Sequence, residues 1–263
     1  MHDYAFPKIG RMPVDSIGQP EVLICLSPIW TEKHETARRL AQRIKIVLDV
    51  ARSKGFRDGE NRVTAIKDAA ILPKVRAKPQ HHGAMRWQDL PAFYALLKDR
   101  RAMAARALLF TCLTAARTNE VLRMRWEEID VAGRLWTCPA ERMKAGEAHR
   151  VPLTPQMLAI LDEQWAPGAE VVFEGQQRHR PMSNMSMLML LRRMGIEGVT
   201  IHGFRSAFRD WAAEAAGAPR EVAEMCLAHR VGTAVERAYA RSDLLEKRRD
   251  LMASWTKYVC EVE

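Results

Sequence analysis

The sequence predicts a mainly α-helical protein with one small antiparallel β-sheet, and three observations lead to this prediction. Between Thr31 and Gly55, apolar residues recur at spacings of three and four with Arg and Lys between them, which is the pattern of an amphipathic helix. Residues typical of strands gather only near positions 134–173. Between Leu72 and Gly83, two prolines and three cations stand without apolar periodicity, which indicates a basic linker after a small N-terminal helical piece.

Helices dominate the part of the chain that follows this linker. Leu90–Leu97 and Met103–Leu113 both have the apolar spacing of a helix. Further helices are predicted toward the C-terminus at Ser183–Met194, Gly203–Ala216, Arg220–Leu227, Thr233–Ala240 and Asp243–Val259. The larger, C-terminal part of the chain is therefore expected to be helix-rich throughout.

The small sheet is predicted from two strand-like segments and the turn between them. Arg134–Pro139 and His149–Leu153 read as strands, and the polar segment ERMKAGEA separates them. Thr154 and Pro155 follow, a pair that suits the N-cap and the first residue of a helix. Another helix is therefore expected to begin directly after the second strand.

The composition indicates a nucleic-acid partner and excludes several classes of protein. The formal net charge of the 263 residues is +9, and a basic surface attracts polyanions while releasing condensed counterions. Nucleic acid is the leading partner on this ground, and an anionic membrane surface is the second. No stretch approaches the roughly 18 apolar residues of a membrane span, and the first residues lack the apolar core of a signal peptide. The five scattered cysteines form no CxxC pair, which argues against a zinc ribbon and a disulfide framework; a cytoplasmic location is expected.

Three local patterns in the C-terminal part contain the residues most suited to chemistry. In TAARTNEVLRMRWEEID, a helix is expected to break at Arg117 and to restart toward Glu120. In IHGFRSAFRDW, His202 and Arg205 are three residues apart and so share one face of a helical turn. The third pattern, CLAHRVGTAVERAYAR, contains His229 and, ten residues later, a tyrosine.

The order of these residues resembles the active-site series of the tyrosine recombinases, the family of the phage integrases. HGFR matches their H-x-x-R box, CLAH resembles their L-G-H box, and Tyr239 stands where their nucleophile follows it. RTNE matches an R-x-x-E pattern with Glu120 at the acidic position, and MKAGEAHRVPL resembles their β-hairpin lysine, here Lys144, with its trailing strand. YAFPKIG, PIWTEKHETARRLAQRI, GEN and AYARSDLLEKRR resemble integrases of satellite phages and genomic islands. The likeness covers almost the whole chain.

The resemblance and the chemistry of phosphodiesters together suggest how the phosphate would be held. Attack by an alcohol on a phosphodiester adds negative charge to the non-bridging oxygens, and two guanidiniums can hold these oxygens in a forked geometry. Arg117 and Arg205 are expected to do this, with a hydrogen bond from His229. His149 precedes a strand and is expected to be structural.

The remaining residues of the series have roles in bond cleavage. Tyr239 needs help as a nucleophile because a phenol has a pKa of about 10, and His202 is expected to assist as a base. Lys144 is the candidate general acid for the leaving 5′ oxygen, although Arg142 stands close by in the same turn. Glu120 is expected to orient its neighbours. No metal ion or other cofactor is required.

The resemblance also implies a domain organisation and partners. Residues 1–75 would be part of a helical core-binding domain, residues 76–84 a basic linker, and residues 85–263 the catalytic domain. The chain begins at a position that resembles the middle of the core-binding domain, so the first helix of that domain and an N-terminal arm-binding domain are expected to be missing. The expected partners are double-stranded DNA at attachment sites and further copies of the chain, as a tetramer. The helix at residues 243–259 is expected to pack on a neighbouring subunit.

Two departures from the family pattern leave alternatives open. Ala115 stands where the family often has glycine before the first arginine, and Ala228 replaces the glycine of the L-G-H box. A site-specific recombinase is expected, but two rivals remain: an inactive DNA-binding remnant, and a type IB topoisomerase-like enzyme that nicks and reseals. A metal-dependent nuclease is disfavoured because no carboxylate cluster is visible.

Overall fold

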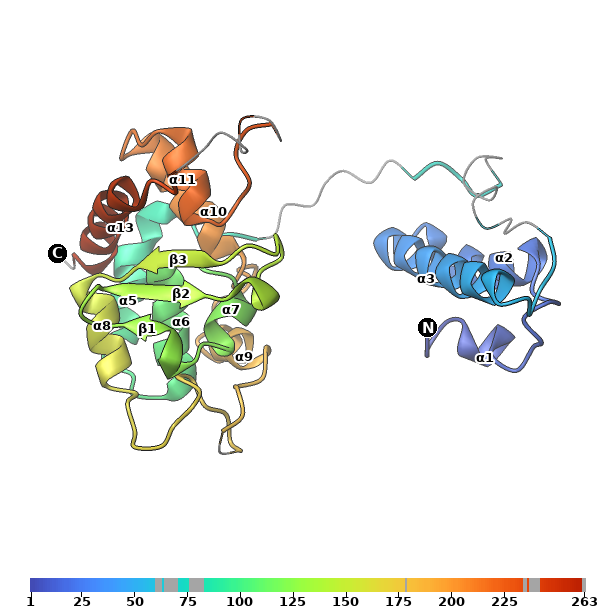
Figure 1. Ribbon diagram of the computed structural model, residues 1–263, viewed down its shortest axis with the longest axis horizontal. Helices are drawn as coiled ribbons and strands as arrows, with labels where there is room; N and C mark the ends of the chain where they lie inside the picture. Colours follow the sequence, from blue (N-terminus) through green and yellow to red (C-terminus); the bar gives the residue numbers. More distant parts are fainter. Residues whose placement is uncertain are drawn as a thin grey trace. The chain divides into compact units, whose positions relative to one another are not determined.

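A computed structural model describes residues 1–59, 63, 71–75, 83–177, 179–233, 236 and 242–261 (Figure 1). The chain divides into two compact units, Met1–Gln80 and His81–Glu263. The described residues are mainly helical with one small antiparallel sheet, as predicted. None of the helices among these residues is long and apolar enough to cross a membrane. Tyr239, most of the predicted linker at 76–84 and most of the predicted helix at 233–240 lie outside the described residues.

The first unit contains α1 (Phe6–Ile9), α2 (Gln19–Trp30) and α3 (His34–Ser53). Helix α3 confirms the amphipathic helix predicted between Thr31 and Gly55, and its apolar stripe packs on α2. Helix α2 was not predicted, because its apolar residues surround the helix and a proline lies inside it. The core of the unit includes Val22, Leu26, Trp30, Leu40, Ile44 and Leu48.

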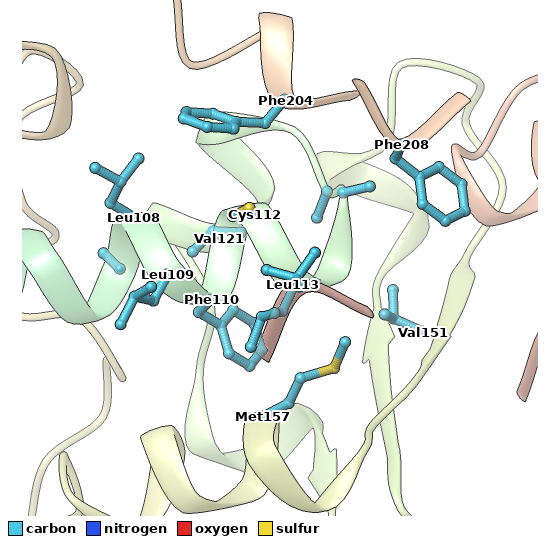
Figure 2. Close-up of a cluster of buried hydrophobic side chains, with 14 of the residues drawn as sticks. Leu108, Leu109, Phe110, Cys112, Leu113, Val121, Val151, Met157, Phe204 and Phe208 are labelled. Atoms are coloured by element: carbon cyan, nitrogen blue, oxygen red, sulfur yellow. The ribbon is translucent and has the colours of Figure 1, made fainter. Parts of the chain in front are cut away.

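The second unit is built around α6 (Met103–Thr114), whose residues from Ala105 to Thr114 are all buried. Helices α5 (Leu90–Leu97), α8 (Pro155–Asp162), α9 (Ser186–Arg193) and α13 (Leu245–Cys260) pack against it. Figure 2 shows its side chains among those of α7 (Thr118–Leu122), of the sheet, of α8 and of α10 (Gly203–Glu214). Because partners lie on every side, α6 is apolar all round rather than amphipathic.

The sheet has three antiparallel strands in the order β1 (Ile129–Asp130), β2 (Leu135–Cys138) and β3 (His149–Pro152). Strands β2 and β3 confirm the two predicted strands, and the short β1 is an addition. Trp136 pairs with Val151 and both are buried. The polar turn predicted between the strands therefore joins two strands that are held by buried side chains.

Helix α13 packs on its own domain. Its Leu251, Met252, Trp255 and Val259 are buried, and Trp255 donates its indole N–H to the carbonyl of Cys112 in α6 at 3.1 Å. Thr154 and Pro155 begin α8 as predicted, but the Thr154 hydroxyl contacts Thr256 Oγ1 of α13 at 3.3 Å rather than the helix backbone. Packing of this helix on a neighbouring subunit stays a prediction, because the structure contains one chain.

Candidate active site

The site begins at a left-handed turn after α6. The helix ends at Thr114, and Ala115 adopts a φ of 50°, a conformation that L-residues other than Asn and Asp rarely adopt. The chain then extends through Arg117, which is the N-cap residue of α7. The break predicted at Arg117 is therefore present, and the left-handed residue turns the carbonyl of Ala115 toward α10.

Arg205, in the first turn of α10, donates a hydrogen bond to that carbonyl. Only 4% of Arg205 is exposed, and its guanidinium donates hydrogen bonds to the carbonyls of Ala115 and Leu227, both at 2.6 Å. Burial, and then the charge of Arg117, lower the pKa of Arg205 to about 10, while Glu120 acts in the opposite direction. Arg205 thus stays positively charged at neutral pH in a fixed position.

Arg117 is held by Glu120 and by a second left-handed turn. The buried Glu120 carboxylate accepts the Arg117 backbone N–H at 2.9 Å and a guanidinium N–H at 2.7 Å, which is the arrangement that an orienting carboxylate requires. The other terminal nitrogen of Arg117 donates to the carbonyl of Ala228 at 3.3 Å. Ala228 has a φ of 51°, so both alanines that replace family glycines are left-handed residues whose carbonyls bind the arginines.

His229 follows this second turn and completes the cluster. Its Nδ1 lies 2.5 Å from Glu224 Oε2, and its Nε2 lies 3.2 Å from a terminal nitrogen of Arg205. Glu224 belongs to α11 (Arg220–Cys226). Glu224 was not predicted from the sequence. The signal for it was the position of a carboxylate five residues before His229, because two side chains at this spacing can come into contact where a helix ends.

Lys144 and His202 are exposed members of the predicted series, as is His229, whose side chain is 40% exposed. Lys144 lies in the β2–β3 turn, and His202 is the N-cap residue of α10. Arg142, the alternative to Lys144, is 17% exposed and is occupied by an ion pair with Glu128 and a hydrogen bond to a backbone carbonyl. The structure therefore gives Arg142 a structural role and leaves Lys144 at the surface of the turn.

A hollow of about 560 Å³ opens beside His229. Its lining includes Arg230 and also Glu236 and Ser242, which flank Tyr239 in the sequence. Arg230 donates to the carbonyl of Ala145 at 2.7 Å and so ties the end of the His229 segment to the turn that carries Lys144. The described residues thus bring Arg117, Arg205 and His229 together.

His149 lies in the wall of the same hollow. Burial, and then the charge of Arg248, lower its pKa to about 4. The ring is therefore neutral at physiological pH, in keeping with the structural role expected for it. Within the described part of the chain, no three His, Cys, Asp or Glu side chains lie together in a way that could hold a metal ion.

A network missed in the sequence fastens the start of α13 to β3. Asp243 accepts two hydrogen bonds from Arg150, at 2.7 and 3.0 Å, and one from Arg248 at 2.6 Å. Arg248, only 1% exposed, also donates to the carbonyl of Arg150 at 2.6 Å. Residues on both sides of Tyr239 are thus bonded to the β2–β3 hairpin, Arg230 before it and Asp243 after it.

Two protein-family models match the chain. The model described as "Phage integrase family" matches residues 84–245, and "Phage integrase central domain" matches residues 1–69. The chain belongs to the phage integrase family. The residues matched by the first of these models include Arg117, Arg205 and His229.

Curated relatives of this phage integrase family member are integrases too. The chain is 34% identical over 263 residues to "Prophage integrase IntA" of Escherichia coli (strain K12), covering 97% of this chain. It is 29% identical over 278 residues to the "Integrase" of Enterobacteria phage P4, again covering 97% of this chain. The chain spans 62% of the length of each of these relatives.

Solved structures of integrases share the fold. A lambda integrase dimer bound to a COC' core site superposes with a TM-score of 0.60 at 17% identity, covering 83% of this chain and 81% of that chain. The Tn1549 transposon integrase in complex with circular intermediate DNA gives a TM-score of 0.58 at 12% identity, covering 93% of this chain and 88% of that chain. The fold is that of the tyrosine recombinases.

Proposed function

We propose that this chain is a site-specific DNA recombinase that cleaves and rejoins DNA through a covalent 3′-phosphotyrosine at Tyr239. One observation carries the proposal: the guanidiniums of Arg117 and Arg205, from segments far apart in the sequence, are held beside each other by backbone carbonyls and Glu120 before any substrate arrives. Fixed charges of this kind stabilise a transition state without reorganisation during the reaction.

The arginines would bind the scissile phosphate. Each guanidinium has five N–H donors, and the hydrogen bonds within the site use only part of them, so donors remain for the non-bridging oxygens. His229 is expected to donate to one of these oxygens from Nε2. That bond requires protons on both ring nitrogens, because its Nδ1 already faces the carboxylate of Glu224.

The remaining residues would make and break the bonds. Tyr239 Oη attacks phosphorus, with assistance from His202 as a base, and the bond from phosphorus to the 5′ oxygen breaks. Lys144 supplies the proton that the 5′ oxygen needs as it leaves. The occupied state of Arg142 supports Lys144 in this role. Attack by a 5′-hydroxyl on the phosphotyrosine reverses the chemistry, so strands rejoin without ATP.

The domain organisation and partners are part of the same proposal. Residues 1–75 would be a partial core-binding domain, residues 76–84 a linker, and residues 85–263 the catalytic domain. Double-stranded DNA at attachment sites is the proposed substrate, supported by the net charge of +9 and by relatives solved as a dimer on a core site and a tetramer on a Holliday junction.

We also propose that the chain assembles as a tetramer and that the segment at residues 243–259 packs on a neighbouring subunit in that assembly. Cross-linking of DNA-bound complexes, assembled from isotopically heavy and light chains, tests the exchange. Heavy–light cross-links between Lys257 and the rest of the catalytic domain would support it. Cross-links within one chain alone, as the buried Trp255 favours, would contradict it.

Covalent trapping tests the reaction. The chain is incubated with nicked duplexes that carry candidate attachment cores, beside Tyr239→Phe, and the products are separated on a denaturing gel. A protein–DNA adduct that the variant lacks supports the proposal. DNA shifted on a native gel without an adduct on any core indicates a binding-only remnant. An adduct with relaxation of supercoils, but no exchange between two sites, indicates a topoisomerase-like enzyme.

A further inference from the structure

Glu224 holds His229 by two different contacts. The carbonyl of Glu224 accepts the backbone N–H of His229 at 3.0 Å, across the left-handed Ala228, which is the bond that closes a Schellman turn at a helix C-terminus. The carboxylate of the same residue lies 2.5 Å from Nδ1 of the ring. Backbone and side chain of one residue thus fix both the position of His229 and the plane of its imidazole.

The partners of the two ring nitrogens determine where the proton lies. Glu224 is 19% exposed at its side chain, and an ionised carboxylate only accepts hydrogen bonds. A guanidinium only donates, so the nitrogen beside Arg205 must be an acceptor in the neutral ring. His229 therefore donates from Nδ1 to Glu224 and accepts from Arg205 at Nε2.

We propose that Glu224 is a positioning residue of the active site, which keeps the proton of His229 on Nδ1 and so directs Nε2 to Arg205. The inference rests on the proposed function for its catalytic consequence, but not for the proton position itself. An imidazole in water prefers its proton on Nε2, and that form would point an N–H at the Arg205 guanidinium. Without Glu224 the ring would turn or change tautomer, and Arg205 would lose one of its supports. The same carboxylate would offset the charge of the ring when Nε2 gains a proton to contact phosphate.

The proton position can be measured directly by NMR on the full chain with ¹⁵N-labelled histidine, at about pH 8 so that ordinary histidines are neutral. His229→Gln assigns the signal. In the unmodified chain Nδ1 of His229 is expected to carry a proton. In Glu224→Ala the released ring is expected to turn away from Arg205 and to carry its proton on Nε2. In Glu224→Gln the amide oxygen can accept the same N–H, so the proton stays on Nδ1. Glu221→Ala is the matched control, because it removes an equal charge from an exposed position of α11.

Single-turnover cleavage at saturating DNA gives the catalytic consequence. The rate is expected to fall about 10- to 100-fold in Glu224→Ala, to stay within about threefold in Glu224→Gln, and to be unchanged in Glu221→Ala. DNA affinity should change equally in the two alanine variants.

Two results would overturn the inference: an unprotonated Nδ1 in the unmodified chain, or an unchanged proton position in Glu224→Ala. A shift of the proton to Nε2 that accompanies lost folding of Glu224→Ala would reduce Glu224 to a structural residue, because an unfolded chain exposes the ring to water. If no DNA is cleaved at all, the recombinase proposal fails while the NMR result still decides the role of Glu224.

Discussion

Replacing Ala228 with glycine is expected to stabilise the protein, although the change removes a methyl group from the active-site region. With a φ of 51°, Ala228 is in a conformation that costs an L-residue roughly 1–2 kcal/mol and costs glycine nothing. Glycine gains more freedom in the unfolded chain, which offsets about 0.4–1 kcal/mol of this. The net gain is therefore about 1 kcal/mol, and Ala115→Gly, at a φ of 50°, should give a similar value.

Urea unfolding followed by tryptophan fluorescence measures this change, because all tryptophans except Trp30 lie in the second unit. The control is Ala107→Gly, at a fully buried alanine inside α6, and this variant should be less stable by about 1 kcal/mol or more. Equal or lower stability of Ala228→Gly, with the control destabilised as expected, would refute the strain argument. The carbonyl of residue 228 keeps its direction in the glycine variant, so Arg117 should keep its contact.

Three further predictions concern other groups of the second unit. The pKa of His149 is about 4 in the folded protein and about 6.5 in the unfolded chain, so the unfolded chain binds more protons between these pH values. The free energy of unfolding should therefore be constant above about pH 6.5 and be lower by about 2 kcal/mol at pH 5. His149→Gln should remove this pH dependence when the free energy of unfolding is measured with urea at several pH values. Arg205→Lys should slow single-turnover cleavage about 100- to 1,000-fold, because one ammonium group cannot contact both carbonyls and the phosphate. An unchanged rate would contradict the role proposed for the Arg205 guanidinium. Asp243→Asn should lower the free energy of unfolding by about 1–2 kcal/mol, because it leaves the buried Arg248 without its ion pair, whereas Glu246→Gln at an exposed pair should change it by less than about 0.5 kcal/mol.

The fold could be predicted where apolar periodicity was clear. Helix α3 has one buried stripe and a charged face, and β2 and β3 flank a polar turn, so each was recognised within a few residues of its observed bounds. Helix α2 has no such stripe, because Pro28 and apolar residues occupy several faces. Periodicity reports burial on one side only, and it is weak for a helix of this kind.

The candidate site could be predicted as a set of residues but not as a geometry. Sequence order brought Arg117, Arg205 and His229 into one hypothesis through the family likeness. It could not show that Ala115 and Ala228 are left-handed, because alanine favours helices and only tertiary contacts force it out of the right-handed region. Nor could spacing favour Lys144 over Arg142 as the candidate acid; the ion pair of Arg142 with the largely buried side chain of Glu128 supports Lys144 in the proposed role.

The cost of holding two like charges together explains why the site needs these turns. Burial, and then the charge of Arg117, lower the pKa of Arg205. The two arginines therefore repel each other in the free protein, and a bound anionic phosphate would relieve this repulsion. Backbone carbonyls at Ala115, Leu227 and Ala228 offset the repulsion without neutralising either arginine, whereas a carboxylate facing the phosphate would compete with it. Glu120 is consistent with this distinction, since it also bonds the backbone N–H of Arg117 and is buried behind the guanidinium rather than open to solvent. A strained turn that aims a neutral carbonyl thus achieves what an added acidic group could not: it fixes the arginine and keeps its charge for the substrate.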